Sequence, residues 1–153
     1  MTAPRARGAA ALLTSLAALA TAVWVQPPAA SATTTSAVTA RISVRSDGAQ
    51  MPNGDDVDDR TAIDETGRYA AFSVKPALQA DDTNGTFDVY LRDRRAGTTT
   101  RVSVTDTEGQ IAGNSHLCGM SDDARFIGFW AKSASLPSGS GGQIFLRDRT
   151  LGT

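Results

Sequence analysis

The hexapeptide GRYAAF at residues 67–72 decides the fold, because it returns as ARFIGF at residues 124–129. Two further blocks recur in the same order. TARISV at 39–44 returns as TTRVSV at 99–104, and VYLRDR at 89–94 returns as IFLRDR at 144–149. Three matched blocks in one order indicate a single supersecondary unit that the chain uses twice.

Each recurring block is typical of a short β-strand. The blocks are enriched in Val, Ile, Phe and Tyr and are bounded by clusters of Gly, Asp, Asn and Ser. No window of helical length after residue 32 keeps apolar residues at a spacing of three to four. The sequence therefore predicts an all-β chain, with strands at 41–45, 68–74, 88–92 and 101–104 and at the matching positions of the second copy.

Tight turns connect these strands. Asp64-Glu65-Thr66-Gly67 and Ser121-Asp122-Asp123-Ala124 each begin with a side chain that can accept a hydrogen bond from the turn. Gly67 can adopt the positive φ that such turns often need. Because Ala124 lacks that freedom, we expect a different turn type in the second copy. Successive hairpins predict an up-and-down antiparallel sheet.

The order of turn, GRYAAFS, loop, DVYLRD and GTTTRVS resembles the TolB-like, WD-repeat-like β-propeller repeat of secreted bacterial proteins. The resemblance covers residues 39–153 and implies two four-stranded antiparallel blades, at about 41–104 and 105–153, which form an incomplete propeller. The family's Ser-x-Asp-Gly-Arg turn is matched imperfectly, because Glu65-Thr66 precedes Gly67-Arg68. The strand count leaves the second blade without its outer strand. Because a ring closes with about four to eight blades, we expect either a longer reading frame or self-association through blade faces, and we favour a fragment of a longer propeller.

The first 32 residues are typical of an export signal. Arg5 and Arg7 precede an uncharged run rich in Ala and Leu, and Ala30-Ser31-Ala32 offers the small residues that a signal peptidase accepts. A membrane anchor is the competing interpretation, because the run approaches the roughly 20 residues that span a bilayer. We favour cleavage after Ala32, followed by a linker at 33–40 and secretion to the cell envelope or the medium.

The charge balance argues against nucleic acid and anionic membranes as partners. Without Arg5 and Arg7, the chain has 13 Lys and Arg against 16 Asp and Glu, a net charge of −3. A mildly acidic surface releases few counterions on meeting a polyanion. A protein or a glycan outside the cell is therefore the expected partner.

The best candidate for a ligand site is the acidic loop at 81–88. Oxygen-bearing side chains at Asp82, Asn84 and Asp88 surround the glycine turn at Gly85, in a spacing similar to that of calcium loops. An Asn-Gly hairpin turn with solvated carboxylates is the alternative. The second copy has Ser138 to Gln143 at this place and lacks the acidic residues. The acidic run at 55–59 could also bind a cation, although such runs usually face solvent.

Other reactive side chains carry no catalytic motif. Cys118 and His116 are the only cysteine and histidine. They are too few for a four-ligand zinc site, and we expect Cys118 to be buried in a strand. The Arg-Asp-Arg triplets at 92–94 and 147–149 suggest structural pairing at the turns, because both copies have them. Four aromatic residues could form a sugar-stacking shelf but are more typical of inter-blade core: Tyr90, Phe129, Trp130 and Phe145.

The sequence thus favours a secreted, non-enzymatic binding or scaffolding module with no cofactor beyond a possible calcium ion. The alternative is one part of a secreted propeller-type hydrolase or lyase that has a calcium-binding loop. No nucleophile elbow and no phosphate-binding glycine loop supports catalysis.

Overall fold

The computed structural model describes residues 38–51, 56–137 and 141–153. The predicted export signal, at 1–32, lies outside the described residues, as does most of the linker. In the described part of the chain every regular element is a β-strand, and no helix there is long and apolar enough to cross a membrane.

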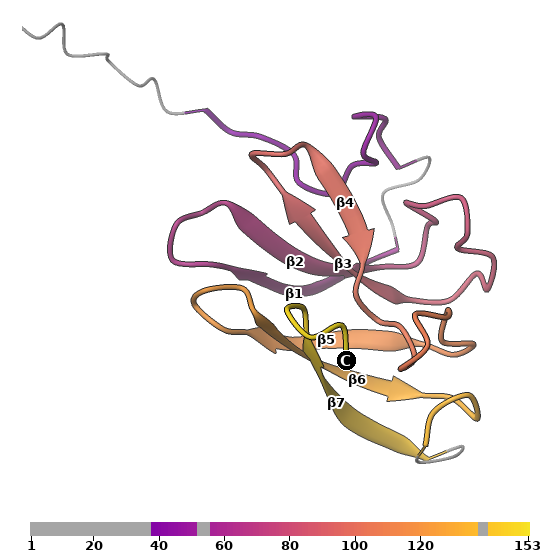
Figure 1. Cartoon of the computed structure of the whole chain (residues 1–153). Helices are drawn as coiled ribbons and strands as arrows, with labels where there is room; N and C mark the ends of the chain where they lie inside the picture. Colours follow the sequence, from indigo (N-terminus) through magenta and orange to yellow (C-terminus); the bar gives the residue numbers. More distant parts are fainter. Residues whose placement is uncertain (1–37, 52–55, 138–140) are drawn as a thin grey trace, which may run out of the picture. The chain divides into compact units, whose positions relative to one another are not determined.

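Seven strands form two antiparallel sheets (Figure 1). In each sheet, strands that follow one another in the chain pair side by side, as the hairpin turns predict. The first sheet has the order β1-β2-β3-β4 and consists of β1 (Val57–Ile63), β2 (Tyr69–Val74), β3 (Asp88–Asp93) and β4 (Thr98–Arg101). The second has the order β5-β6-β7 and consists of β5 (Ser115–Met120), β6 (Phe126–Lys132) and β7 (Gly142–Asp148).

The second sheet has three strands, as the strand count predicts for a second blade without its outer strand. Two strand predictions were wrong. The strand expected at 101–104 lies instead at Thr98–Arg101, as β4. Residues 41–45 form no strand; only Val44 makes an isolated bridge, to Gln50. Inside this segment Val44 N donates to Ile42 O, which bends the backbone out of the extended form, and the next turn follows at once, with Gly48 N donating to Arg45 O. Residues 104–110 repeat this turn, with a bridge from Val104 to Gln110.

The expected difference between the two hairpin turns was also wrong. Ala124 has a φ of 55°, close to the 68° of Gly67, so both turns have the same backbone. In each, the first residue's side chain accepts a hydrogen bond from the strand that follows: Tyr69 N reaches Asp64 Oδ1 at 2.6 Å, and Phe126 N reaches Ser121 Oγ at 2.9 Å. The surrounding hydrogen bonds therefore hold an alanine in the left-handed region.

The Arg-Asp-Arg triplets are structural, as predicted, and pair with the turns. Asp93 accepts a forked set of bonds from Arg68, and Asp148 accepts the same set from Arg125, with shortest distances of 2.6 and 2.7 Å. Each aspartate also accepts backbone N–H groups of its own hairpin turn. The two ion pairs thus fix equivalent corners of the two sheets.

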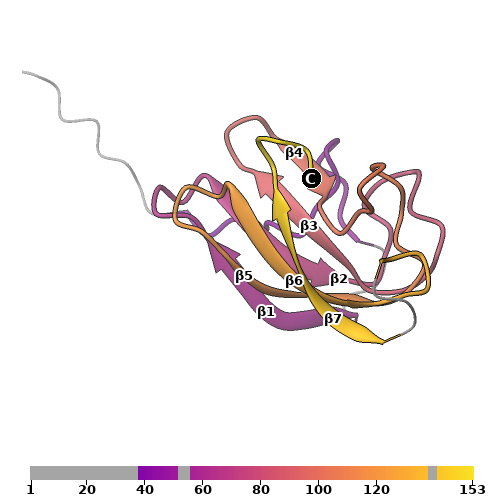
Figure 2. The same ribbon diagram turned by 60° about the horizontal axis from the view of Figure 1, so that its bottom comes forward.

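Figure 2 shows the strands of the two sheets from a second side. The main core consists of side chains from both sheets and lies between them. The β1–β4 sheet contributes Ala71, Val89 and Leu91. We call the face with these residues the rear face of the first sheet and the other face its front face, and the repeat-equivalent faces of the second sheet have the same names. The β5–β7 sheet contributes its front face, with Leu117, Ile127, Phe129 and Ala131. The loop that precedes β5 fills the space between them with Val102 and Ile111.

A second, smaller core covers the front face of the β1–β4 sheet. Phe72, Val74 and Tyr90 lie under Ile42 and Met51 of the loop that precedes this sheet. By the repeat, Ile42 and Met51 match Val102 and Ile111 of the main core, sixty residues later. Both sheets therefore have their front face covered in the same way.

Candidate functional site

The rear face of the β5–β7 sheet differs from its counterpart in the first sheet. Ile144 and Leu146 of β7 are 72% and 64% exposed. By the repeat they match Val89 and Leu91 of β3, which are 0% and 4% exposed because they pack against the second sheet. Strand pairing confirms the match, since Leu91 lies opposite Ala71 and Leu146 lies opposite Gly128. We call this uncovered rear surface, with Trp130 and Gly128, the open face.

The centre of the open face is flat. Gly128 of β6 lies between Gly119 of β5 and Leu146 of β7. A β-carbon added at Gly119 would meet no atom within 4 Å, so nothing in the described chain stands above it. Large apolar side chains on a flat, uncovered sheet surface are typical of a protein-binding surface.

Trp130 has a special place on this face. Its ring lies against Gly142, where an added β-carbon would come within 2.5 Å of the indole. The equivalent residues in the first sheet are Ser73 and Phe87, so the aromatic side chain has moved from one strand to its neighbour. Both sheets therefore have one aromatic ring at this corner.

An open groove of about 870 Å³ borders the open face along β1. His116 lies at its centre, with its ring 5.1 Å from the Phe87 ring and 5.8 Å from the Trp130 ring, between centroids. Asp58 Oδ2 lies 2.7 Å from His116 Nδ1. Burial acts to raise the pKa of Asp58, but the bonds with His116, Asp59 and the Arg60 backbone outweigh burial and lower it.

Within the described ranges, no nucleophile forms a hydrogen bond with the second imidazole nitrogen of the Asp58–His116 pair. An aspartate that holds one imidazole nitrogen needs a nucleophile in hydrogen-bond reach of the other. Cys118 lines the same groove, but its Sγ lies 3.9 Å from the His116 carbonyl oxygen and forms no hydrogen bond with the ring. The pair ties β1 to β5 and so helps to hold the two sheets together.

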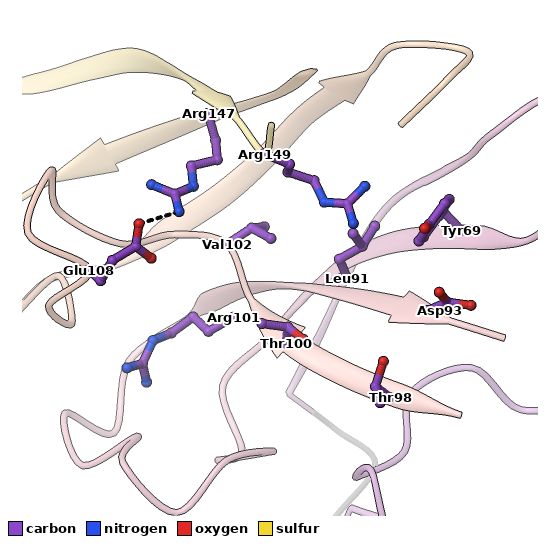
Figure 3. Close-up of a pocket in the computed structure, with 10 residues that line it drawn as sticks. All are labelled: Tyr69, Leu91, Asp93, Thr98, Thr100, Arg101, Val102, Glu108, Arg147 and Arg149. Carbon is purple, nitrogen blue, oxygen red and sulfur yellow. Dashed lines mark hydrogen bonds and ion pairs between the residues drawn. The ribbon is translucent and has the colours of Figure 1, made fainter. Parts of the chain in front are cut away.

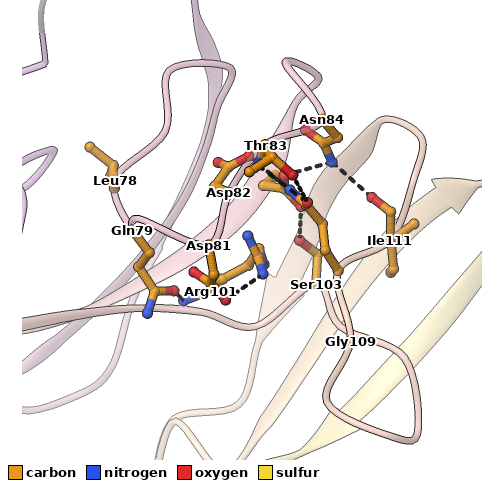
Figure 4. A network of polar contacts seen from close by, with 12 residues as sticks. Leu78, Gln79, Asp81, Asp82, Thr83, Asn84, Arg101, Ser103, Gly109 and Ile111 are labelled. Atoms are coloured by element: carbon orange, nitrogen blue, oxygen red, sulfur yellow. Dashed lines mark hydrogen bonds and ion pairs between the residues drawn. The ribbon is translucent and has the colours of Figure 1, made fainter.

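The predicted calcium residues lie together in a polar network (Figure 4). Asn84 Nδ2 donates to Asp88 Oδ2 at 3.1 Å and to Ile111 O at 2.8 Å. Asp88 Oδ1 accepts from Ser103 Oγ at 2.7 Å, and Asp82 accepts from the Tyr90 hydroxyl and from Gln110 Nε2. Protein donors thus bind the oxygens that calcium would need.

Burial sets the charge state of this network. Asp88 is fully buried, which raises the pKa of its carboxyl although Ser103 and Asn84 bind it. The buried guanidinium of Arg101, which pairs with Asp81 at 2.9 Å, acts in the opposite direction on Asp88. Within the described ranges no group of three or more His, Cys, Asp or Glu side chains could hold a metal ion. The calcium site stays a prediction from the sequence.

A smaller cavity of about 230 Å³ lies at the opposite end of the seam between the sheets (Figure 3). Arg147 crosses it to pair with Glu108, and the Arg149 guanidinium lies over the Tyr69 ring at 4.6 Å. Arg68 stacks on the same ring at 4.6 Å. The contact between Arg149 and Tyr69 fastens the hairpin after β7 to the first sheet.

One expectation about a single side chain needs correction. Cys118 is exposed, because it lies beside Gly128 on the uncovered side of the second sheet. Core positions for the aromatic residues were expected, and Tyr90 and Phe129 are 0% and 2% exposed, while the half-buried Phe145 packs against the main core. Trp130 is also half-buried and lies on the open face beside the groove. Sequence reasoning missed the open face, although the repeat itself maps Ile144 and Leu146 onto buried positions.

Comparison with known proteins finds no family model that matches the chain and no curated protein with significant sequence similarity.

Proposed function

We propose that the chain is a secreted, non-enzymatic binding or scaffolding module of β-propeller-type blades, and that it binds protein through the open face. One observation carries this proposal. Ile144 and Leu146 are exposed at the two positions where the first copy of the repeat buries Val89 and Leu91 against another sheet. Burying two such side chains contributes about 3 kcal/mol or more, so an occupant of this face would be favoured by the hydrophobic effect.

The composition of the face favours protein over glycan. A sugar site needs several hydrogen-bonding groups around an aromatic ring. The open face has one aromatic ring, that of Trp130, which lies against Gly142, and aliphatic side chains at Ile144 and Leu146 beside Gly128. This arrangement suits a sheet or another apolar protein surface.

The propeller-type description has separate support. Both sheets are antiparallel with sequential strands, and one packs its rear face on the front face of the other. The hydrolase or lyase alternative depends on a calcium loop, and the oxygens of that loop are bound by protein donors. The pattern of residues 1–32 supports secretion.

Site-specific photocrosslinking in the organism that makes the protein tests the proposal. A photoreactive amino acid replaces Leu146 in one variant and Leu151 in a control variant. Leu151 is equally accessible, at 69% exposed, but lies in the hairpin turn after β7. We expect a discrete protein adduct from position 146 and none from position 151. Equal or absent adducts from the two positions would refute binding through the open face.

A further inference from the structure

The front face of the first sheet has uncovered apolar residues that complement the open face. Val57 and Ile63 of β1 are 43% and 63% exposed. Strand pairing matches them to Ser115 and Met120 of β5. Ile63 lies opposite Ala70, and Met120 lies opposite Ile127, the repeat counterpart of Ala70. In the same way Val57 lies opposite Val74, and Ser115 lies opposite Ala131. Ser115 is fully buried and Met120 packs against the main core. The two exposed residues thus lie where the second sheet meets a neighbour.

The exposed apolar side chains of the described chain therefore concentrate on the two surfaces that the repeat would place in contact. The described chain exposes six large hydrophobic residues, and four of them lie on these two surfaces: Val57, Ile63, Ile144 and Leu146. The repeat makes the open face equivalent to the rear face of the first sheet. It also makes the front face of the first sheet, where Val57 and Ile63 lie, equivalent to the front face of the second sheet.

On this basis we propose that the partner of the open face is a second copy of the same chain, bound head to tail. The open face of one copy packs on the front face of the β1–β4 sheet of the next, so the contact repeats the packing of the two sheets inside one chain. This inference rests on the proposed binding role of the open face and names its partner.

Polar contacts inside the chain support the same register. The Tyr69 ring has two guanidinium partners, Arg68 from its own sheet and Arg149 from the second. Phe126 is the counterpart of Tyr69, and in the part of the chain that the structure describes its ring has one guanidinium partner, Arg125, at 4.7 Å. By the repeat, Arg94 matches Arg149. In the head-to-tail pair, Arg94 of one chain therefore lies over the Phe126 ring of the other chain.

The turns give a second such contact. Glu65 N of the first sheet donates to Asp122 O of the second at 3.1 Å. By the repeat, Asp122 matches Glu65. In the head-to-tail pair, Asp122 N of one chain therefore faces Glu65 O of the next chain. Head-to-tail contacts use two different surfaces and therefore continue until a ring closes. With two sheets in each copy, closure at about four to eight blades corresponds to about two to four copies.

Complementation between two charge variants tests the inference. Leu146→Arg disables the open face, and Ile63→Arg disables the front face. Both side chains are exposed, so the monomer should fold, and thermal unfolding of each variant checks this. Sedimentation velocity of the purified chain over a range of concentrations then gives the mass of each species. Leu151→Arg is the matched control.

We expect the wild type and Leu151→Arg to form a closed set of a few copies. Each interface variant should be weakened about 30-fold or more and sediment as a monomer. An equimolar mixture of the two should form a 1:1 dimer, because each variant retains the surface that the other lacks.

Three results would overturn the inference. A monomeric wild type excludes a second copy as the occupant, and if Leu146 still crosslinks to another protein in cells, the proposed function stands without it. A monomer in which Leu146 is protected from modification means that another part of the same chain covers the face. Loss of assembly in Leu146→Arg but not in Ile63→Arg indicates a symmetric contact between open faces.

Discussion

Tyr90→Phe tests whether the acidic loop is held by protein donors. Tyr90 is fully buried, and its hydroxyl donates to Asp82 and accepts a bond from Leu78 N at 3.4 Å. Burial, and then the bond to Asp82, raise the pKa of Tyr90, so the hydroxyl stays a donor at any physiological pH. The ring contact with Phe72, at 6.4 Å between centroids, survives the substitution.

The expected loss follows from the one deleted atom. Asp82, only 8% exposed, keeps Gln110 as a donor but loses its hydroxyl partner. A hydrogen bond to a charged group contributes about 1.5–3 kcal/mol, so we expect about 2 kcal/mol less free energy of unfolding. Equilibrium urea unfolding measures this loss as a lower midpoint with an unchanged slope.

The second tyrosine provides the control. Tyr69 is half-buried and interacts with the rest of the described chain through its ring. Tyr69→Phe should therefore stay within about 0.5 kcal/mol of the wild type. If Tyr90→Phe also stays within that range, the hydroxyl does not hold Asp82, and the loop oxygens are free for another ligand.

Three further predictions concern the turns, the acidic loop and the open face. Forked bonds from Arg125 lower the pKa of Asp148 to about 2, so its contribution to stability is complete above its ordinary value of 3.8 and is lost as pH falls towards 2. Asp148→Asn should flatten this part of the acid unfolding curve, and an unchanged curve would show that the ion pair is not formed. Calcium and EGTA should give coinciding thermal unfolding curves, whereas stabilisation by calcium would support a metal at Asp82, Asn84 and Asp88. Gly142→Ala should displace the Trp130 ring and change its fluorescence, while Gly119→Ala should not; equal spectra for both variants would contradict the packing of Trp130.

The repeat made most of the fold predictable. Strand type, sequential pairing and the equivalent corners at Asp93 and Asp148 follow from blocks that recur in one order. Predictions from residue type alone were wrong where the surrounding structure sets the backbone conformation or the exposure of a residue. Ala124 takes a positive φ because the Ser121 side chain and the turn bonds fix it. Cys118 is exposed because it lies beside Gly128, on the side of the second sheet that the described chain leaves uncovered.

The candidate site was harder to predict, because it depends on contacts distant in sequence. Asp58 and His116 are 58 residues apart and meet only once the sheets pack. Asp82, Asn84 and Asp88 have the spacing of a cation loop, yet Ser103 and Gln110 come from another part of the chain to bind the two aspartates. The open face needs both the repeat and the exposure of Ile144 and Leu146 to be recognised.

Crosslinking between mixed isotopes tests the central claim most directly. A chain with a photoreactive residue at 146 is mixed with isotopically labelled wild-type chain, irradiated and digested, and the crosslinked peptides are identified by mass spectrometry. The head-to-tail arrangement predicts adducts between position 146 of one isotope and residues 57–63 of the other. Adducts confined to one isotope, or formed between the two copies of position 146, would contradict it.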